Sequence, residues 1–136
     1  MADVQPKILL VDDEADVRKT VGRRLQQQGF EVLTAEGGEE GLRIAEEQQP
    51  ALILLDIMMP KMTGRDVCQR LKANPKTQRI PVIFLTALGY ADNIKAGLDL
   101  GAEDYIVKPF EPAVLKERIT VCLARHGREG SERLSP

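Results

Sequence analysis

Three short, uninterrupted apolar runs limit most strongly how this chain can fold. Ile8–Val11, Leu52–Leu55 and Val82–Leu85 are continuous apolar segments that are too short for helices. Strands buried on both faces have this pattern, and such strands belong to parallel sheets. Val32–Ala35 and Tyr105–Val107 are shorter or less apolar, as outer strands are. The runs therefore predict a sheet with three central and two outer strands.

Helical periodicity fills the segments between the runs. Val17, Val21 and Leu25 recur every four residues, and this pattern stops at Gly29, a residue type common after helix C-termini. Four weaker patterns follow, at Leu42–Ala45, Val67–Leu71, Ile94–Leu98 and Leu115–Leu123. Five strand–helix units predict an α/β fold, a single doubly wound parallel sheet in the flavodoxin-like order 2-1-3-4-5 with five helices.

Length and composition argue for one ordinary domain. Of the 136 residues, we expect 1–126 to form it and 127–136, which lack apolar periodicity, to be a flexible tail or linker stub. The net charge of −2 gives no global attraction to nucleic acid or to an anionic membrane. No apolar run approaches the ~18 residues that span a bilayer, and Met1–Lys7 lacks the pattern of a signal peptide.

The two cysteines give no sign of a disulfide framework. Cys68 and Cys122 fall on predicted amphipathic helices, where small buried thiols are common. We therefore expect the reducing environment of the cytoplasm. The net charge and the short apolar runs add the expectation of no membrane contact and no direct binding of nucleic acid. His126, at the start of the tail, is expected to be solvated and is assigned no chemical role.

Polar side chains follow four of the five predicted strands at the points where the apolar runs end. Asp12 and Asp13 follow the first run, Asp56 the third, Thr86 the fourth and Lys108 the fifth. The carboxyl ends of parallel strands meet at one edge of a sheet, and ligands bind there where the winding direction reverses. In the order 2-1-3-4-5 that point lies between the first and third strands. The sequence therefore predicts one site built from these residues.

The charges at this edge indicate the chemistry. Three carboxylates in one crevice repel each other; Lys108 offsets one charge, and a divalent cation would offset the other two. Oxygen ligands of this kind suit Mg²⁺ or Mn²⁺. Asp56 is the candidate nucleophile for an aspartyl-phosphate, with Lys108 and the Thr86 hydroxyl contacting the phosphoryl oxygens. Each residue alone could be a turn, cap or surface residue, but their conjunction favours a phosphoryl-transfer site.

The motifs around these positions resemble the receiver domains of two-component response regulators over almost the whole of Lys7–Leu123. Leu10–Glu14 resembles the family's acidic pair, and Asp56–Pro60 with Gly64 resembles its acceptor loop and the glycine that follows. Thr86–Ala87 resembles the switch hydroxyl with its small neighbour, and Gly101–Tyr105 with Lys108–Phe110 resembles the final signature. The resemblance implies phosphorylation of Asp56 by a histidine kinase or histidine phosphotransferase, with self-catalysed phosphorylation and slow dephosphorylation as the chain's only catalysis.

The resemblance also implies details that the residues alone do not. The backbone carbonyl of Met58 would join Asp12, Asp13 and Asp56 as a metal ligand. The bond between Lys108 and Pro109 would be cis, a state found almost only before proline. Tyr105 would be an aromatic switch that moves as Thr86 turns toward the phosphoryl group; the alternative is an ordinary half-buried strand aromatic.

The signalling face would comprise the fourth helix, the fifth strand and the fifth helix. Charges there resemble those that receivers fused to winged-helix DNA-binding domains use to form homodimers; they are Glu103, Asp104, Arg118 and Arg125. Ile94 and Val114 stand where that subfamily usually has an ion pair. A homodimer through this face and a solvated charged face therefore remain alternatives.

Two other classes of protein fit less well. A haloacid-dehalogenase-like phosphatase needs an acid two residues after its aspartyl nucleophile, where this chain has Met58. A flavodoxin-like FMN carrier needs a phosphate cradle of Ser, Thr and Gly after its first strand, where Asp12, Asp13 and Glu14 would repel phosphate unless a metal intervened. The sequence does not identify the kinase, the signal or the output.

Overall fold

The five predicted strands form one parallel sheet. The computed structural model describes residues 5–87 and 98–134, with side chains described as far as His126. The sheet has the order β2-β1-β3-β4-β5, and every neighbouring pair is parallel. Its strands are β1 (Lys7–Val11), β2 (Glu31–Ala35), β3 (Leu52–Asp56), β4 (Val82–Ala87) and β5 (Asp104–Lys108). The predicted strand order is confirmed.

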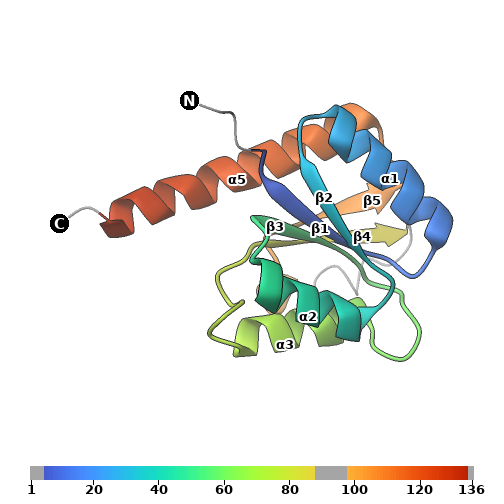
Figure 1. Ribbon diagram of the computed structural model, residues 1–136, viewed down its shortest axis with the longest axis horizontal. Helices are drawn as coiled ribbons and strands as arrows, with labels where there is room; N and C mark the ends of the chain where they lie inside the picture. Colours follow the sequence, from blue (N-terminus) through green and yellow to red (C-terminus); the bar gives the residue numbers. More distant parts are fainter. Residues whose placement is uncertain (1–4, 88–97, 135–136) are drawn as a thin grey trace.

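Helices cover both faces of the sheet. Within the described residues they are α1 (Ala15–Gln27), α2 (Gly38–Gln48), α3 (Gly64–Ala73) and α5 (Pro112–Leu134), four helices where five are predicted. The predicted helix at Ile94–Leu98 lies outside the described residues except for its last position. Figure 1 shows α1 and α5 on one face of the sheet and α2 and α3 on the other. The chain is a doubly wound α/β fold.

Alternate residues of the central strands supply two core layers. Leu9 and Leu55 belong to the layer beneath α2 and α3, whereas Ile8, Leu10 and Leu54 belong to the layer beneath α1 and α5. All five side chains are fully buried. A slip of one residue in strand register would exchange the two sets of side chains between faces, and each fully buried aliphatic side chain contributes about 1.5–3 kcal/mol. The β1–β3 register is therefore strongly fixed, and it sets where the residues after these strands lie.

The last helix continues past Gly127, the expected start of the tail. α5 continues to Leu134, so the backbone of 127–134 is helical where a flexible tail is predicted. Figure 1 shows this helix running well beyond the sheet. A helix that has passed the sheet needs no apolar face, because its backbone groups bond within the helix. The missing apolar periodicity therefore does not mark the end of the helix.

No helix in the described part of the chain combines the length and the apolar character needed to cross a membrane.

Candidate functional site

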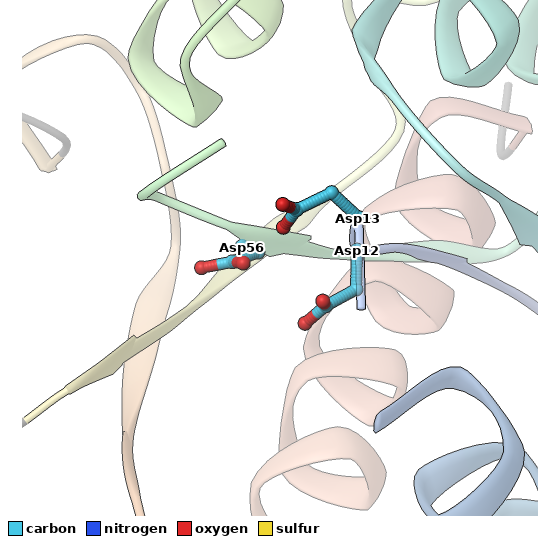
Figure 2. Close-up of side chains that lie close together, drawn as sticks. All are labelled: Asp12, Asp13 and Asp56. Carbon is cyan, nitrogen blue, oxygen red and sulfur yellow. The ribbon is translucent and has the colours of Figure 1, made fainter. Parts of the chain in front are cut away.

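Three carboxylates meet at the carboxyl edge of the sheet. Asp12 and Asp13 directly follow β1, and Asp56 is the last residue of the neighbouring strand β3. One carboxylate oxygen from each residue lies within 4.8 Å of the others. Figure 2 shows the three side chains projecting to the same side of the strand ends. The structure therefore brings together the three acids that the sequence places at one edge.

Lys108 reaches this cluster from the end of β5. Its Nζ lies 3.1 Å from Asp12 Oδ2 and 3.9 Å from Asp56 Oδ1. The peptide bond between Lys108 and Pro109 is cis, as predicted. One ammonium against three carboxylates leaves the described cluster with a surplus of two negative charges. Asp12 and Asp56 are both buried, so this surplus is costly unless a cation joins them.

Backbone donors hold two of the acids in place. Asp12 Oδ1 accepts a hydrogen bond of 2.9 Å from the N–H of Glu14, and Asp56 Oδ1 accepts one of 3.1 Å from the N–H of Met58. The Met58 main chain therefore lies beside the Asp56 carboxylate, while 51% of Met58 is exposed. These bonds orient the carboxylates without removing the surplus of negative charge.

A close approach of two backbone segments explains the glycine at the start of α3. Gly64 donates its N–H to the carbonyl of Ile57 at 2.9 Å. A Cβ on Gly64 would lie 2.7 Å from Ile57 Cα and still closer to the carbonyl oxygen of Asp56. Thr63 caps α3 through a capping box with Asp66. The start of α3 is thus pressed against the end of β3, which fixes the backbone of Asp56.

Thr86 and Tyr105 lie on neighbouring strands near the acids. Thr86 is almost fully buried at the end of β4, and its Oγ1 donates a hydrogen bond of 3.4 Å to the carbonyl of Ala87. Asp56 pairs with Leu85 in the sheet register, so Thr86 stands one residue farther along β4. Tyr105 pairs with Phe84, is partly buried and packs against the core beneath α2 and α3. Along the strand direction, Thr86 thus lies closer to the acids than Tyr105 does.

Burial dominates the titration of Asp56. It raises the pKa of this carboxyl group to about 6; the charges of Asp12 and Asp13 add to the rise, and Lys108 and the Met58 N–H oppose it. A carboxylate that keeps its proton to such a pH lacks full charge compensation. The donor set contains oxygen atoms alone, and hard divalent cations such as Mg²⁺ prefer this set. The cluster is compatible with a divalent metal site.

A family model decides the classification. The model of the response regulator receiver domain matches residues 8–120. The chain belongs to this family. The family matches the resemblance identified from the motifs, and its match includes four complete strands, β1 from its second residue, and the three clustered acids. The chain is therefore a receiver domain of a two-component response regulator.

Known relatives support this classification along the whole domain. The receiver domain is 47% identical over 125 residues to the Porphyra purpurea protein named "Probable transcriptional regulator ycf27", covering 92% of this chain and 50% of the relative. It is 43% identical over 125 residues to the phosphate regulon transcriptional regulatory protein PhoB of Pseudomonas aeruginosa, covering 92% of this chain and 55% of PhoB. The chain thus spans about half the length of these curated relatives.

Solved structures agree with the fold. The chemotaxis protein CheY4 of Vibrio cholerae superimposes with a TM-score of 0.81 at 32% identity, covering 86% of this receiver domain and 98% of the CheY4 chain.

Arg18 is a contact of the site that the sequence analysis missed. Its Nη1 donates a hydrogen bond of 2.7 Å to the carbonyl of Asp12, and its Nη2 lies 3.5 Å from Glu36 Oε1. The side chain is only 16% exposed, whereas that of Glu36 is 76% exposed. A cation in the first turn of a helix opposes the helix dipole. That unfavourable position was the available sequence signal that Arg18 has a partner outside its helix.

His126 also differs from its expectation. The side chain is 23% exposed, and Nε2 lies 3.0 Å from Glu103 Oε1. It is therefore a partly buried residue of α5 and not a solvated residue of a tail. Cys68 and Cys122 are buried free thiols, in agreement with the expected absence of a disulfide framework.

Proposed function

We propose that Asp56 accepts a phosphoryl group in a Mg²⁺-dependent reaction and that the added charge switches the signalling face of the domain. One observation supports this most directly: Asp56 lies beside Asp12 and Asp13 with one ammonium for three carboxylates. Such a cluster favours both a divalent cation and an incoming group that the cation can help to bind. Membership of the receiver family supports the same chemistry.

The donor is proposed to be the phosphohistidine of a histidine kinase or histidine phosphotransferase. An oxygen of Asp56 forms the new bond to phosphorus while the P–N bond of phosphohistidine breaks, and the donor imidazole leaves with the electron pair. Water later attacks the phosphorus, which restores the carboxylate and releases inorganic phosphate. The chain promotes only these steps on itself, so it acts as a switch and does not turn over a diffusing substrate.

The metal ligands in this proposal are Asp12, Asp13, Asp56 and the backbone carbonyl of Met58. The hydrogen bond from the Met58 N–H to Asp56 keeps that stretch of backbone next to the acids. Mg²⁺ is the preferred ion and Mn²⁺ an alternative, because both favour oxygen ligands. When bound, the ion supplies positive charge for the phosphoryl oxygens and for the carboxylates that surround them.

Lys108 and Thr86 supply the remaining contacts. The Lys108 ammonium, already 3.9 Å from Asp56, neutralises part of the charge on the phosphoryl oxygens. The Thr86 hydroxyl, bonded only weakly to Ala87 among the described residues, can rotate to donate to those oxygens. In this proposal Tyr105 would move inward as Thr86 turns toward the phosphoryl group, and its movement would carry the signal to β5 and α5. The predicted fourth helix of this face lies outside the described residues.

The output of the switch is also a proposal. The ycf27 and PhoB relatives are named as transcriptional regulators, so a regulatory output fits, whereas direct binding of nucleic acid by this domain is not proposed. Within one chain, Arg118 bonds both carboxylate oxygens of Asp104 at 2.9 Å, and Arg125 lies 3.4 Å from Glu103. A phosphorylation-dependent homodimer would exchange such pairs between copies, and sedimentation velocity with and without acetyl phosphate tests it.

Labelling by a small phosphodonor tests the acceptor. With acetyl phosphate and Mg²⁺, we expect intact-mass spectrometry to show one added phosphoryl group on the wild type and none on Asp56→Asn. Asp16→Asn is the matched control, because it makes the same chemical change at an exposed position of α1 and should label normally. Full labelling of Asp56→Asn would overturn the proposal.

Metal binding is tested separately by calorimetry. Asp13→Ala should bind Mg²⁺ at least tenfold more weakly than the wild type, because it removes one of the clustered carboxylates. Asp16→Ala serves as the control. Equal affinities of Asp13→Ala and the wild type would show that Asp13 is not a metal ligand.

A further inference from the structure

A hollow lies at the edge of the sheet opposite the carboxylate cluster. It has a volume of about 830 Å³ and is walled by the segments before β3, β4 and β5, by the end of α3 and by His126 of α5. Figure 1 shows α5 passing beyond the sheet at the edge where the strands begin. Volumes of this size are typical of small-molecule sites. None of the residues proposed for phosphoryl transfer lines this hollow.

Lys72 stands in the wall of the hollow with its charge incompletely paired. Its Nζ donates to the carbonyl oxygens of Ile80 at 2.8 Å and Gln78 at 3.2 Å. An ammonium has three donors, and Nζ has no third acceptor and no carboxylate within ion-pair distance among the described residues. Burial lowers the pKa of Lys72, while the nearby Cys68, Glu103 and Cys122 raise it. The ammonium is thus fixed in place, partly desolvated and ready to accept an anionic partner.

The charges around the hollow leave a positive surplus. Lys76 is paired with Glu46 at 3.2 Å, and Glu103 is paired with Arg125 at 3.4 Å. These two pairs neutralise themselves. Lys72 and Arg79 remain, and Arg79 forms no ion pair with any described residue. Lys72 and Arg79 therefore have no ion-pair partner among the described residues, although the Glu103 carboxylate lies close enough to Lys72 to raise its pKa.

One part of the wall is apolar and stiff, whereas Gln49, Gln78 and His126 add polar groups to the remainder. Pro50, Pro75 and Pro81 line the hollow together with Ile80. The pyrrolidine rings fix the backbone φ angle, so these walls lose little freedom when a ligand binds. A preformed apolar wall beside two cations suits a molecule that carries both an anionic group and a flat or aliphatic body.

We propose that this hollow is a binding site for a small organic anion, in which Lys72 and Arg79 bind a carboxylate or phosphate-type group and the proline wall contacts the body that carries it. Arg79 would contribute paired donors in one plane, and Lys72 a fixed point charge. The site is independent of phosphoryl transfer, since its residues lie at the other edge of the sheet.

Titration with two aromatic probes tests the proposal. Phenylphosphonate and benzoate are added to ¹⁵N-labelled protein with EDTA and at constant ionic strength, and amide shifts are followed. We expect saturable shifts at Lys72, Arg79 and Glu103, and a higher affinity for phenylphosphonate than for inorganic phosphate because only the former contacts the prolines. The relative affinities of phenylphosphonate and benzoate distinguish a phosphate-type from a carboxylate ligand.

Matched variants separate a built site from general attraction to a basic surface. Lys72→Met and Arg79→Gln should each weaken phenylphosphonate binding at least tenfold. Arg43→Gln removes one positive charge at an exposed position of α2 and should change the affinity less than twofold. Arg79 is exposed, so its variant remains informative even if Lys72→Met does not fold. Shifts that stay linear in probe concentration, or equal affinity in Arg79→Gln and Arg43→Gln, would mean an adventitious ion only and would overturn the proposal.

Discussion

Lys108 Nζ lies nearer to Asp12, at 3.1 Å, than to Asp56, at 3.9 Å. The ammonium thus pairs mainly with an acid proposed to hold the metal, and the acceptor carboxylate is left undercompensated. This agrees with a pKa of Asp56 that burial raises to about 6. The arrangement leaves the negative charge of Asp56 to be offset by a second cation, and in the proposed function Lys108 would turn from Asp12 toward the phosphoryl group.

Replacing Lys108 should separate metal binding from phosphoryl transfer. In Lys108→Met the site loses its positive charge, so Mg²⁺ should bind about tenfold more tightly, as expected for removing one like charge at a few ångströms in a medium of intermediate dielectric. Labelling by acetyl phosphate should nevertheless fall at least tenfold, because the phosphoryl oxygens lose a partner. Calorimetry and intact-mass kinetics measure the two effects. Lys116→Met, which makes the same change at an exposed position of α5, is the control. Weaker Mg²⁺ binding in Lys108→Met would contradict this electrostatic account.

The raised pKa of Asp56 makes stability depend on pH. The carboxyl group holds its proton in the folded state to about pH 6 but loses it near pH 4 when unfolded. Between these values the folded state binds more protons, so the free energy of unfolding without metal should fall as pH rises from 4 to 6. Asp56→Asn removes this cost and should be more stable at pH 7 by on the order of 1–2 kcal/mol after allowance for solvent screening.

Urea denaturation at pH 4, 5, 6 and 7 measures the effect. The advantage of Asp56→Asn should become small as the pH falls to 4, where the Asp56 carboxyl group of the wild type is protonated in the folded state and about half protonated in the unfolded state. Saturating Mg²⁺ should abolish the advantage at pH 7, because the cation favours the ionised carboxylate. A constant difference between the two proteins at every pH would rule out Asp56 titration as its cause.

The apolar runs of the sequence were sufficient to predict the central strands and the meeting of the acids at their ends. Ile8–Val11 and Leu52–Leu55 could be assigned to central parallel strands because both their faces are apolar, and the position of Asp56 beside Asp12 followed from the strand order. The length of α5 could not be predicted this way, because residues beyond the sheet have no core to mark them. The position of Arg18 in the first turn of α1 signals a partner outside the helix, but residue types do not show that this partner is the backbone carbonyl of Asp12.

Arg18 should therefore matter for stability. Arg18→Met keeps much of the aliphatic stem but removes the donor to the Asp12 carbonyl and the contact with Glu36. Leaving that carbonyl without its charged donor should lower the free energy of unfolding by about 1–3 kcal/mol. Urea denaturation measures this, with Arg23→Met as a control at an exposed position of the same helix. Equal losses in the two variants would show that Arg18 contributes no more than a surface charge.

Gly64 offers a test of how tightly the acceptor strand end is held. In Gly64→Ala the new Cβ would meet Ile57 Cα at 2.7 Å and the Asp56 carbonyl, and both are backbone atoms that cannot rotate away. The start of α3 must then move off β3, which should cost about 2–4 kcal/mol of stability and slow labelling of Asp56. Gly22→Ala is the matched control, because its Cβ would meet Val32 at an ordinary 3.8 Å inside a helix that favours alanine. We expect Gly22→Ala to be neutral or stabilising in urea denaturation, with unchanged labelling; a Gly64→Ala protein that matched it in both measurements would show that the close approach does not hold the acceptor in place.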